Sequence, residues 1–309
     1  MFSVERFMQQ GRFFYWLWNH PLNQHARIKA IIRFLRWQIG SRLLGREVLL
    51  PFVDDKVLLV SKGMTGATGN YYCGLHEHNE MAFVLHTLRD GDLFVDVGAN
   101  VGSYTILAAH TGANVISVEP IPYTFNRLKK MIAVNLLSES QVDAHCIGLA
   151  DKEGQLVFTA GLDTTNHVLY TPPSKQFKNT TVETITAPVL TLDILLQDKA
   201  ATMIKIDVEG FEHIVLKGAT SALKSEKLLA LIIEMNGNNN KYGIGDQEIL
   251  DLMAQNGFSP FSYAPFDRKL QDAHKGKGNT IFCSTAHKHV ILQRIVSAPK
   301  FGISNGIYI

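Results

Sequence analysis

The chain has 309 residues, 46% of them hydrophobic and 19% charged, with a formal net charge of +2. This composition is typical of a soluble globular protein with a large core, and no apolar run reaches the roughly 18 residues that a membrane span needs. Charged residues among the first twelve positions argue against a cleavable secretory signal. The three cysteines, Cys73, Cys146 and Cys283, are far apart and odd in number, which indicates a reducing, cytoplasmic location without a disulfide framework or zinc site.

Residues 1–50 form a basic, aromatic-rich extension. They contain eight Lys or Arg and two acids, so this segment carries +6 and the remaining chain carries −4. Residues 26–44 have the pattern of an amphipathic helix with a basic face. One hypothesis is contact with an anionic membrane surface, or with a lipid-linked or acidic acceptor. The alternative, which common occurrence favours, is a helix packed on the main domain with its basic face in water.

The next segment, residues 51–75, is predicted to contain a strand and a glycine-rich loop. Val48 to Ser61 has strand character, and four glycines between positions 63 and 74 suggest either a lid over a site or a plain connector. A helix follows. The acidic and histidine residues at its start, from His76 to Glu80, do not match a zinc-binding helix, so we expect no metal there.

Residues 93–120 carry the strongest functional pattern. Leu93 to Val97 is an apolar run typical of a strand that is buried on both faces, and a glycine-bracketed turn and a helix follow it. A second apolar run ends in Glu119, about 20 residues after the first glycine, which is the spacing at which an acid meets a ribose. The order strand, glycine turn, helix, strand, acid therefore predicts a site for a nucleoside-containing cofactor.

Two cofactors compete for this site. A dinucleotide fingerprint has the form G-x-G-x-x-G, whereas this turn has Asn100 at the second glycine position and follows the pattern D-x-G-x-x-x-G. The turn resembles the first motif of class I S-adenosylmethionine-dependent methyltransferases. A nicotinamide-dependent oxidoreductase remains an alternative, as does a noncatalytic cofactor-binding module that docks a partner through the N-terminal helix.

Strands and helices then alternate enough to predict a doubly wound sheet. A helix from Pro122 to Asn135 precedes a strand at 142–147, and a turn at Asp151 leads into a strand at 155–159. Residues 160–187 break the alternation and are predicted to be an insertion at the rim of the site. Asn166 and His167 are the most reactive-looking residues of this insertion.

Residues 203–219 form the second informative stretch. Met203 to Val208 is predicted to be a strand with Asp207 and Glu209 at its carboxyl end, and Gly210 turns the chain into a helix that carries His213. A further strand, 228–233, ends in Glu234. Residues 258–266 and 279–283 are expected to close the sheet as an antiparallel pair. The methyltransferase domain is thus predicted to span 76–285, followed by a tail at 286–309.

Four motifs in order, VDVGANVGSYT, the acid of SVEP, TLD at 191–193 and KIDVEGFE, resemble the FkbM family of class I methyltransferases over roughly residues 75–260. This resemblance implies a Rossmann-like, doubly wound α/β fold with a mostly parallel seven-stranded sheet, here with an N-terminal helical extension. It implies S-adenosylmethionine as the donor and a hydroxyl of a sugar, glycan or secondary metabolite as the acceptor. The cofactor-binding residues that we expect on this basis are Glu77, Asp96, Gly98, Asn100, Gly102, Glu119 and Asp151.

Methyl transfer to an alcohol requires alignment of oxygen, methyl and sulfur and removal of a proton. Asp207 or Glu209 is the expected base, with His213 and then His167 as further candidates; cofactor positioning and helix capping are the alternative roles for the two acids. A divalent ion held by Asp207, Glu209 and Glu234 is a minor alternative, so we predict no metal. Because the chain beyond residue 50 is not basic, nucleic acid is not an expected partner.

Overall fold

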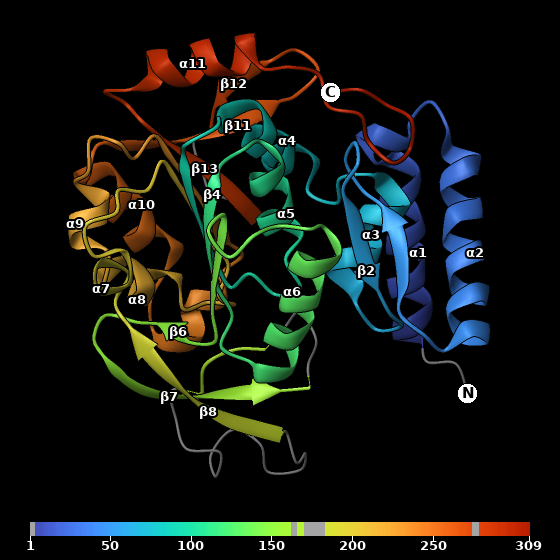
Figure 1. Cartoon of the computed structure of the whole chain (residues 1–309), viewed down its shortest axis with the longest axis horizontal. Coiled ribbons are helices and arrows are strands. Elements are labelled where there is room, and N and C mark those ends of the chain that lie inside the picture. The colour runs from blue at the N-terminus through green and yellow to red at the C-terminus, as the bar shows by residue number, and fades with distance from the viewer. Residues whose placement is uncertain (1–3, 162–165, 170–182, 274–277) are drawn as a thin grey trace.

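The computed structural model describes residues 4–161, 166–169, 183–273 and 278–309. A large central sheet is covered by helices on both faces, an N-terminal lobe lies beside it, and a small sheet lies at one end (Figure 1). The chain is therefore an α/β protein, as predicted.

The central sheet has eight strands among the described residues. In their order across the sheet they are β12 (Lys269–Asp272), β11 (Phe258–Ala264), β13 (Gly278–Ser284), β10 (Ala230–Met235), β9 (Met203–Ile206), β3 (Leu93–Val97), β4 (Asn114–Val118) and β5 (Val142–His145). The five strands from β10 to β5 are parallel, and β13, β11 and β12 are antiparallel. This confirms the doubly wound, mostly parallel sheet and its antiparallel closing pair. The predicted count of seven was one too low, because β12 adds an edge strand.

The strand sequences explain why the sheet is buried on both faces. Successive residues of a strand point to opposite faces, and here both faces are apolar. Phe94 packs into one hydrophobic core and Val95 into the other, and Ile232 and Ile233 divide in the same way. Two cores on either side of one sheet require helices on both sides, which is the doubly wound arrangement.

Helices cover the two faces in two groups (Figure 1). One face carries α4 (His78–Thr87), α5 (Ser103–His110) and α6 (Pro122–Val134). The other carries α7 (Leu192–Leu196), α8 (Glu212–Lys217), α9 (Thr220–Leu223) and α10 (Asp246–Gln255). The strand order reverses at β3, since the chain runs from β3 through β4 to β5 and then returns to β9 on the other side. Ligands of open α/β sheets bind at such a switch point, beyond the carboxyl ends of the strands.

The N-terminal lobe is largely helical. It consists of α1 (Val4–Asn19), η1 (Pro21–Asn23), α2 (Arg27–Leu44), β1 (Val48–Pro51), β2 (Val57–Val60) and α3 (Thr65–Cys73). The segment predicted as one strand is a hairpin of β1 and β2.

The prediction of a glycine-rich loop is wrong, because most of this segment forms the helix α3. A Cβ atom on Gly69 would lie 2.4 Å from the His76 ring, so the absence of a side chain there allows close packing.

The C-terminal tail holds the lobe against the main domain. After α11 (Lys288–Ser297), Ile303 forms a β-bridge with Val53. The Asn305 side-chain amide donates hydrogen bonds to the carbonyl oxygens of Leu22 and Cys73, both at 2.9 Å. No structure was predicted for this tail from its residues.

A small second sheet follows β5. Its strands are β6 (Gly148–Leu149), β8 (Glu183–Leu190) and β7 (Gly154–Ala160). The strand predicted at 155–159 is β7, which pairs with β8 outside the central sheet. Much of the predicted insertion 160–187, including Pro172 and Pro173, lies outside the described residues.

Candidate functional site

A cavity of about 1190 Å³ opens where β3, β4, β9 and β10 end and where the N-terminal lobe faces them. It exceeds the roughly 300–1,000 Å³ typical of a site for one small ligand. The cavity therefore has room for two reactants at the switch point of the sheet.

The turn from β3 to α5 is shaped by a close contact between strands. Gly98 has φ +76°, and a Cβ atom there would lie 1.9 Å from the backbone oxygen of Asp207. The Gly98 and Ala99 N–H groups both donate to the carbonyl oxygen of Val118, at 3.0 and 2.9 Å. Only glycine fits this position, and it holds the first motif against the end of β9.

Glu119 sits at the carboxyl end of β4, inside the cavity. One carboxylate oxygen accepts from the Asn100 N–H and the other from the Ile121 N–H, both at 3.0 Å. Asn100 has φ +50°, which turns its N–H toward this acid. Burial raises the pKa of Glu119 to about 7. Each oxygen has one backbone donor, so each retains a lone pair for a ligand hydroxyl.

Two residues of the predicted cofactor set have structural contacts. Asp96 lines the cavity, but it is 1% exposed and accepts a 2.7 Å hydrogen bond from the Thr105 hydroxyl, which ties β3 to α5. Burial raises its pKa. Gly102 does not line the cavity. It has φ +94°, and a Cβ there would lie 2.6 Å from Leu128, so this glycine lets α5 approach α6.

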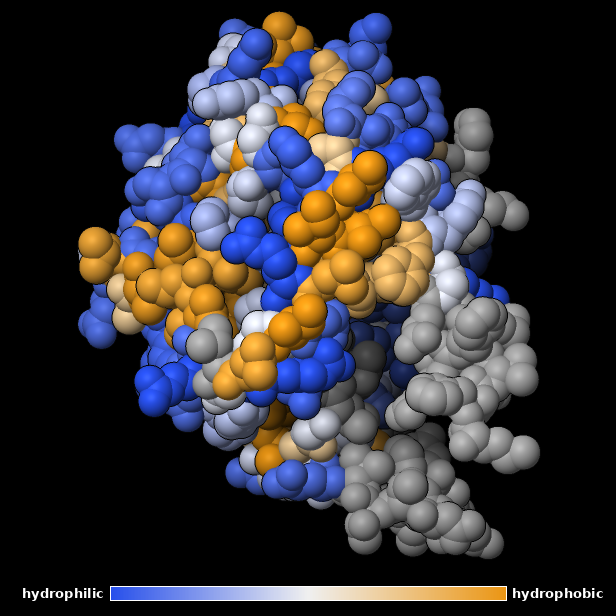
Figure 2. Space-filling view, turned by 90° about the vertical axis from the view of Figure 1, so that its right-hand side faces the viewer, coloured by the Kyte–Doolittle hydropathy of each residue, from blue (hydrophilic) through white to orange (hydrophobic). Residues whose placement is uncertain are grey.

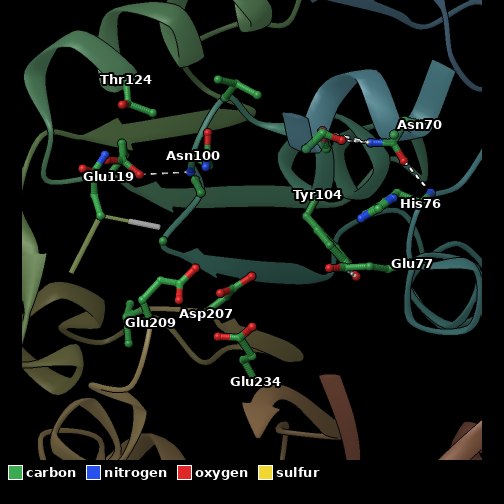
Figure 3. Close-up of a pocket in the computed structure, with 18 of the residues that line it drawn as sticks. Asn70, His76, Glu77, Asn100, Tyr104, Glu119, Thr124, Asp207, Glu209 and Glu234 are labelled. Atoms are coloured by element: carbon green, nitrogen blue, oxygen red, sulfur yellow. Dashed lines mark hydrogen bonds between the residues drawn. The ribbon is translucent and has the colours of Figure 1, made fainter. Parts of the chain in front are cut away.

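Three carboxylates gather at the ends of β9 and β10. One oxygen each of Asp207, Glu209 and Glu234 lies within 4.8 Å of the others, and Figure 3 shows the three side chains pointing toward one another. Burial, reinforced by Asp207, raises the pKa of Glu209 to about 7. Burial together with Asp207 and Glu209 raises the pKa of Glu234 well above its ordinary value. Glu209 and Glu234 thus favour a bound proton, or a positive charge nearby.

Lys205 already supplies a positive charge beside this cluster. Its ammonium group donates a 2.8 Å hydrogen bond to Asp207 and lies 4.7 Å from the centre of the Tyr104 ring. Burial alone would lower the pKa of Lys205, but the carboxylates of Asp207, Asp96 and Glu77 outweigh it and raise the pKa. Lys205 was not among the residues predicted from the sequence. Its place in the strand MIKI could have indicated a role, because this apolar strand is expected to be buried on both faces of the sheet and a lysine there needs a partner.

The turn after β9 holds Glu209 in an unusual backbone conformation. Glu209 has φ +55° and Gly210 has φ +104°. A carboxylate oxygen of the buried Glu212 accepts from the N–H groups of Val208 and Gly210, both at 3.0 Å, and so fixes the turn. A residue other than glycine at positive φ has a strained backbone, and such residues are concentrated at functional sites.

The other predicted residues divide between the cavity and its surroundings. Glu77 lines the cavity and accepts a 2.5 Å hydrogen bond from the Tyr104 hydroxyl, while His167 lines it from the predicted insertion. Asp151 is exposed in the turn before β7 and does not line the cavity. His213, on α8, is 8% exposed and also lies outside the lining; burial lowers its pKa. The structure thus does not bring Asp151 or His213 to the site.

The N-terminal lobe forms the remaining wall of the cavity. Aromatic side chains from three of its helices line it, and none of these was predicted as a site residue: Phe13, Phe14, Trp16, Phe34 and Tyr72. Their rings contact one another, with the Phe13 and Phe34 centroids 5.1 Å apart and those of Phe34 and Tyr72 5.3 Å apart. On the same side His76 lies near Asn70, whose side-chain oxygen accepts a 2.7 Å hydrogen bond from the backbone N–H of His76 (Figure 3).

The fold and the site together define a nucleoside-cofactor enzyme: a doubly wound sheet, a glycine turn after the first central strand, and an acid at the end of the second. Comparison with known proteins specifies the class. The model of the methyltransferase FkbM domain matches residues 96–260. The chain belongs to this family, and it is a methyltransferase.

One curated relative is the hexuronic acid methyltransferase AglP of Haloferax volcanii. It is 26% identical over 187 residues, which cover 58% of this chain and 68% of the relative. Solved structures overlap weakly. A precorrin 8w decarboxylase of Methanobacterium thermoautotrophicum has a TM-score of 0.40 at 13% identity and covers 68% of this chain and 90% of its own. A TehB-like methyltransferase of Corynebacterium glutamicum has a TM-score of 0.37 at 11% identity and covers 71% and 94%. These overlaps are too weak to bear on the activity.

Family membership bears on the competing hypotheses about the cofactor. It supports the methyl donor that the D-x-G-x-x-x-G turn indicated.

Proposed function

We propose that the protein is an S-adenosylmethionine-dependent O-methyltransferase that acts on a sugar hydroxyl. One observation carries the proposal: the ribose-type acid Glu119 and the carboxylates of Asp207 and Glu209 line a single cavity with room for donor and acceptor. The donor supplies an electrophilic methyl group on a sulfonium. The residues of the chain bind and orient the two reactants and accept the proton.

Glu119 and the β3–α5 turn would hold the donor. The two backbone N–H groups fix the carboxylate of Glu119 without using all its acceptor capacity, which suits a ribose diol. The adjacent turn is kept open by Gly98 and leads to the N-terminus of α5. An N-terminus of a helix stabilises a carboxylate such as that of the methionine moiety. The proposed site for the methyl donor therefore consists of hydrogen-bonding groups that the fold already holds in place.

Glu209 is our candidate for the general base. Its pKa of about 7 is close to the value at which a base is both unprotonated and able to take a proton. Asn238 donates a 3.1 Å hydrogen bond to one of its oxygens and orients the group. In the transfer, the acceptor oxygen forms its bond to the methyl carbon as the carbon–sulfur bond breaks, and Glu209 takes the hydroxyl proton. Asp207 is already paired with Lys205 and would position the site and tune its charge.

The aromatic wall supports a sugar acceptor. Carbohydrate rings present C–H groups that pack on aromatic faces, and aromatic rings supply large, rigid contact areas. Arg42 also lines the cavity and would pair with an acidic sugar. The name of the relative, a hexuronic acid methyltransferase, supports the same acceptor class at low identity.

Calorimetric titration with S-adenosylhomocysteine tests the donor site. We expect binding that Glu119→Ala weakens by tenfold or more, since the acid provides charge-assisted hydrogen bonds. Asp151→Ala is the matched control: it removes an exposed acid of the predicted set that lies outside the cavity and should leave affinity unchanged. Binding of NAD instead, or equal effects of both variants, would contradict the proposal.

A second assay tests the acceptor. Transfer of labelled methyl groups to a panel of glycans should favour sugars with a carboxylate over the matching neutral sugars, and Arg42→Gln should reduce that preference. Methylation of neutral sugars alone would remove the support for an acidic acceptor while leaving the donor site intact.

A further inference from the structure

Helix α2 exposes a continuous stripe of large hydrophobic side chains, which we call the α2 stripe. Its members are 47 to 80% exposed and are Ile28, Ile32, Leu35, Ile39 and Leu43. Their spacing of three or four residues places them along one face of the helix. Figure 2, which looks onto the side where α2 lies, shows hydrophobic residues gathered in a diagonal band across this face.

The stripe lies on the side of α2 that faces away from its packed face. The opposite face of α2 is the packed one, where Ala30 is fully buried and Trp37 is 8% exposed. Nine of the sixteen large hydrophobic side chains that are exposed among the described residues lie between Phe14 and Leu49. A concentration of this kind marks a surface that contacts something else. The alternative that the sequence favoured was a helix packed on the main domain with its basic face in water; here the apolar face is exposed as well.

Basic side chains border the stripe. The 18 residues of α2 include five Lys or Arg and no acid. By their helical positions, Lys29 and Arg36 lie along one border and Arg42 along the other. None of these three forms an ion pair with any residue that the structure describes. Their charge therefore remains available to an anionic partner.

Trp18, near the C-terminal end of α1, lies beside the N-terminal end of α2. Trp18 is 40% exposed, and the Arg27 guanidinium of α2 lies over its ring at 5.3 Å from the ring centre. Tryptophan and basic side chains together are typical of elements that sit at the boundary between lipid and water.

From these features we propose that the α2 stripe docks on an anionic phospholipid bilayer, with the helix lying in the plane of the membrane surface. The apolar centre enters the boundary between headgroups and acyl chains, and Lys29 and Arg36 on one border pair with lipid phosphates. Of the helices in the described ranges, none is long and apolar enough to cross a membrane. The contact is therefore a peripheral one.

Docking in this way brings the cavity to the membrane. Leu35 belongs to the stripe and also lines the cavity, together with Phe14 and Arg42. The mouth of the cavity thus lies along the edge of the docking surface. This consequence, access to acceptors held at the membrane, rests on the proposed function, whereas the docking itself does not.

Vesicle co-sedimentation with the full chain tests the docking. We expect the protein to bind vesicles of equimolar phosphatidylcholine and phosphatidylglycerol. Ile39→Gln/Leu43→Gln should lower the partition coefficient about tenfold or more, because two apolar side chains leave the interface. Lys29→Gln/Arg36→Gln should lower it roughly thirtyfold, since each surface cation contributes about a factor of five. Vesicles of phosphatidylcholine alone should bind weakly and show no effect of the charge variant.

The matched control is Leu292→Gln/Val296→Gln on α11, which changes two exposed apolar residues with the same spacing. It should bind vesicles like the unchanged protein. Binding to neither vesicle type, or equal losses in the α2 and α11 variants, would overturn the proposal. So would a dimer, measured by light scattering, that Ile39→Gln/Leu43→Gln converts to monomers without any vesicle binding, because the surface would then belong to a second copy.

The outcome can be separated from that of the proposed function. Vesicle binding is measured without donor or acceptor, and S-adenosylhomocysteine binding is measured without vesicles. Ile39 and Leu43 do not line the cavity, so their variant should retain cofactor affinity and methyl transfer to a free, soluble acceptor. Loss of vesicle binding with retained cofactor binding isolates the docking surface.

Discussion

Replacing Gly98 by alanine should displace the residues of the site and also strain the local backbone. Gly98 joins the β3–α5 turn to the end of β9, and the added Cβ would lie 1.9 Å from the Asp207 backbone oxygen. Contacts below 3.0 Å essentially do not occur for real Cβ atoms. The turn and the end of β9 must therefore separate by about 1 Å or more.

Two costs add in this variant. The first is left-handed backbone strain of about 1–2 kcal/mol, because Gly98 has φ +76°. The second is overpacking of about 1–3 kcal/mol, and the separation also stretches the 3.0 Å hydrogen bond from the Asp207 N–H to the Val97 carbonyl oxygen. The free energy of unfolding should fall by about 2–5 kcal/mol in total.

Gly91→Ala provides a matched control for the strain. Gly91 has φ +78°, almost the same as Gly98, but nothing lies within 4 Å of its added Cβ. Urea unfolding should therefore show a loss of about 1–2 kcal/mol for Gly91→Ala and a clearly larger loss for Gly98→Ala. Methyl transfer should fall about 100-fold in Gly98→Ala only, because a misplacement of 1 Å at the reacting groups has an effect of that size.

Equal destabilisation of the two variants would refute this reasoning, because the close contact would then carry no energy. A Gly98→Ala protein that is destabilised but fully active would refute a different step. It would show that the position of Asp207 relative to the first motif is not important for transfer.

Three further predictions concern charged groups. For Glu209→Gln, kcat should fall about 10²–10⁴-fold. At saturating donor and acceptor, the kcat of the unchanged enzyme should fall as the pH drops below about 7, where Glu209 becomes protonated; a variant that shows the same decrease of kcat would exclude Glu209 as the base. Lys205→Met should lower the free energy of unfolding by roughly 3 kcal/mol, because it leaves the Asp207 charge unpaired. Thermal unfolding should show that Lys205→Met/Asp207→Asn recovers part of this stability. An equal or greater loss of stability in the double variant would contradict the pairing. Glu80→Gln should raise stability at pH 8 by roughly 2–3 kcal/mol and have little effect at pH 4. Burial raises the folded-state pKa of Glu80 to about 7, above its value in the unfolded chain. The stability that protonated Glu80 allows is therefore fully present below the unfolded pKa and is lost as the pH rises through 7. An effect of Glu80→Gln on urea unfolding that does not depend on pH would contradict this expectation.

The central sheet could be predicted because its signals are local. Most of the parallel strands are short apolar runs, and glycine or proline marks the end of some of them, as at Gly98 and Pro120. The acids at the ends of these strands follow from the same pattern, since parallel strands bring their carboxyl ends to one edge. This is why Glu119, Asp207, Glu209 and Glu234 were predicted near the site and lie in the cavity lining.

Contacts between distant segments could not be predicted from the sequence. Gly102 has the spacing of a cofactor glycine, but α6 packs so closely on it that its role is structural. The glycines of α3 were predicted to form a loop because the close packing of Gly69 on the His76 ring is not visible in the sequence. Lys205 was overlooked because an ion pair with Asp207 is visible only when both side chains are placed.

The N-terminal lobe illustrates how such contacts bear on specificity. Leu17 and Trp37 of the lobe share one hydrophobic core with Phe94 and Met203 of the central sheet, so the aromatic wall is held in a fixed position opposite the donor motifs. The wall and the motifs come from separate parts of the sequence. Substitutions on the cavity face of the lobe can therefore change the acceptor without altering donor binding, and we expect acceptor preference to depend on residues such as Phe34 and Tyr72 rather than on the motif residues.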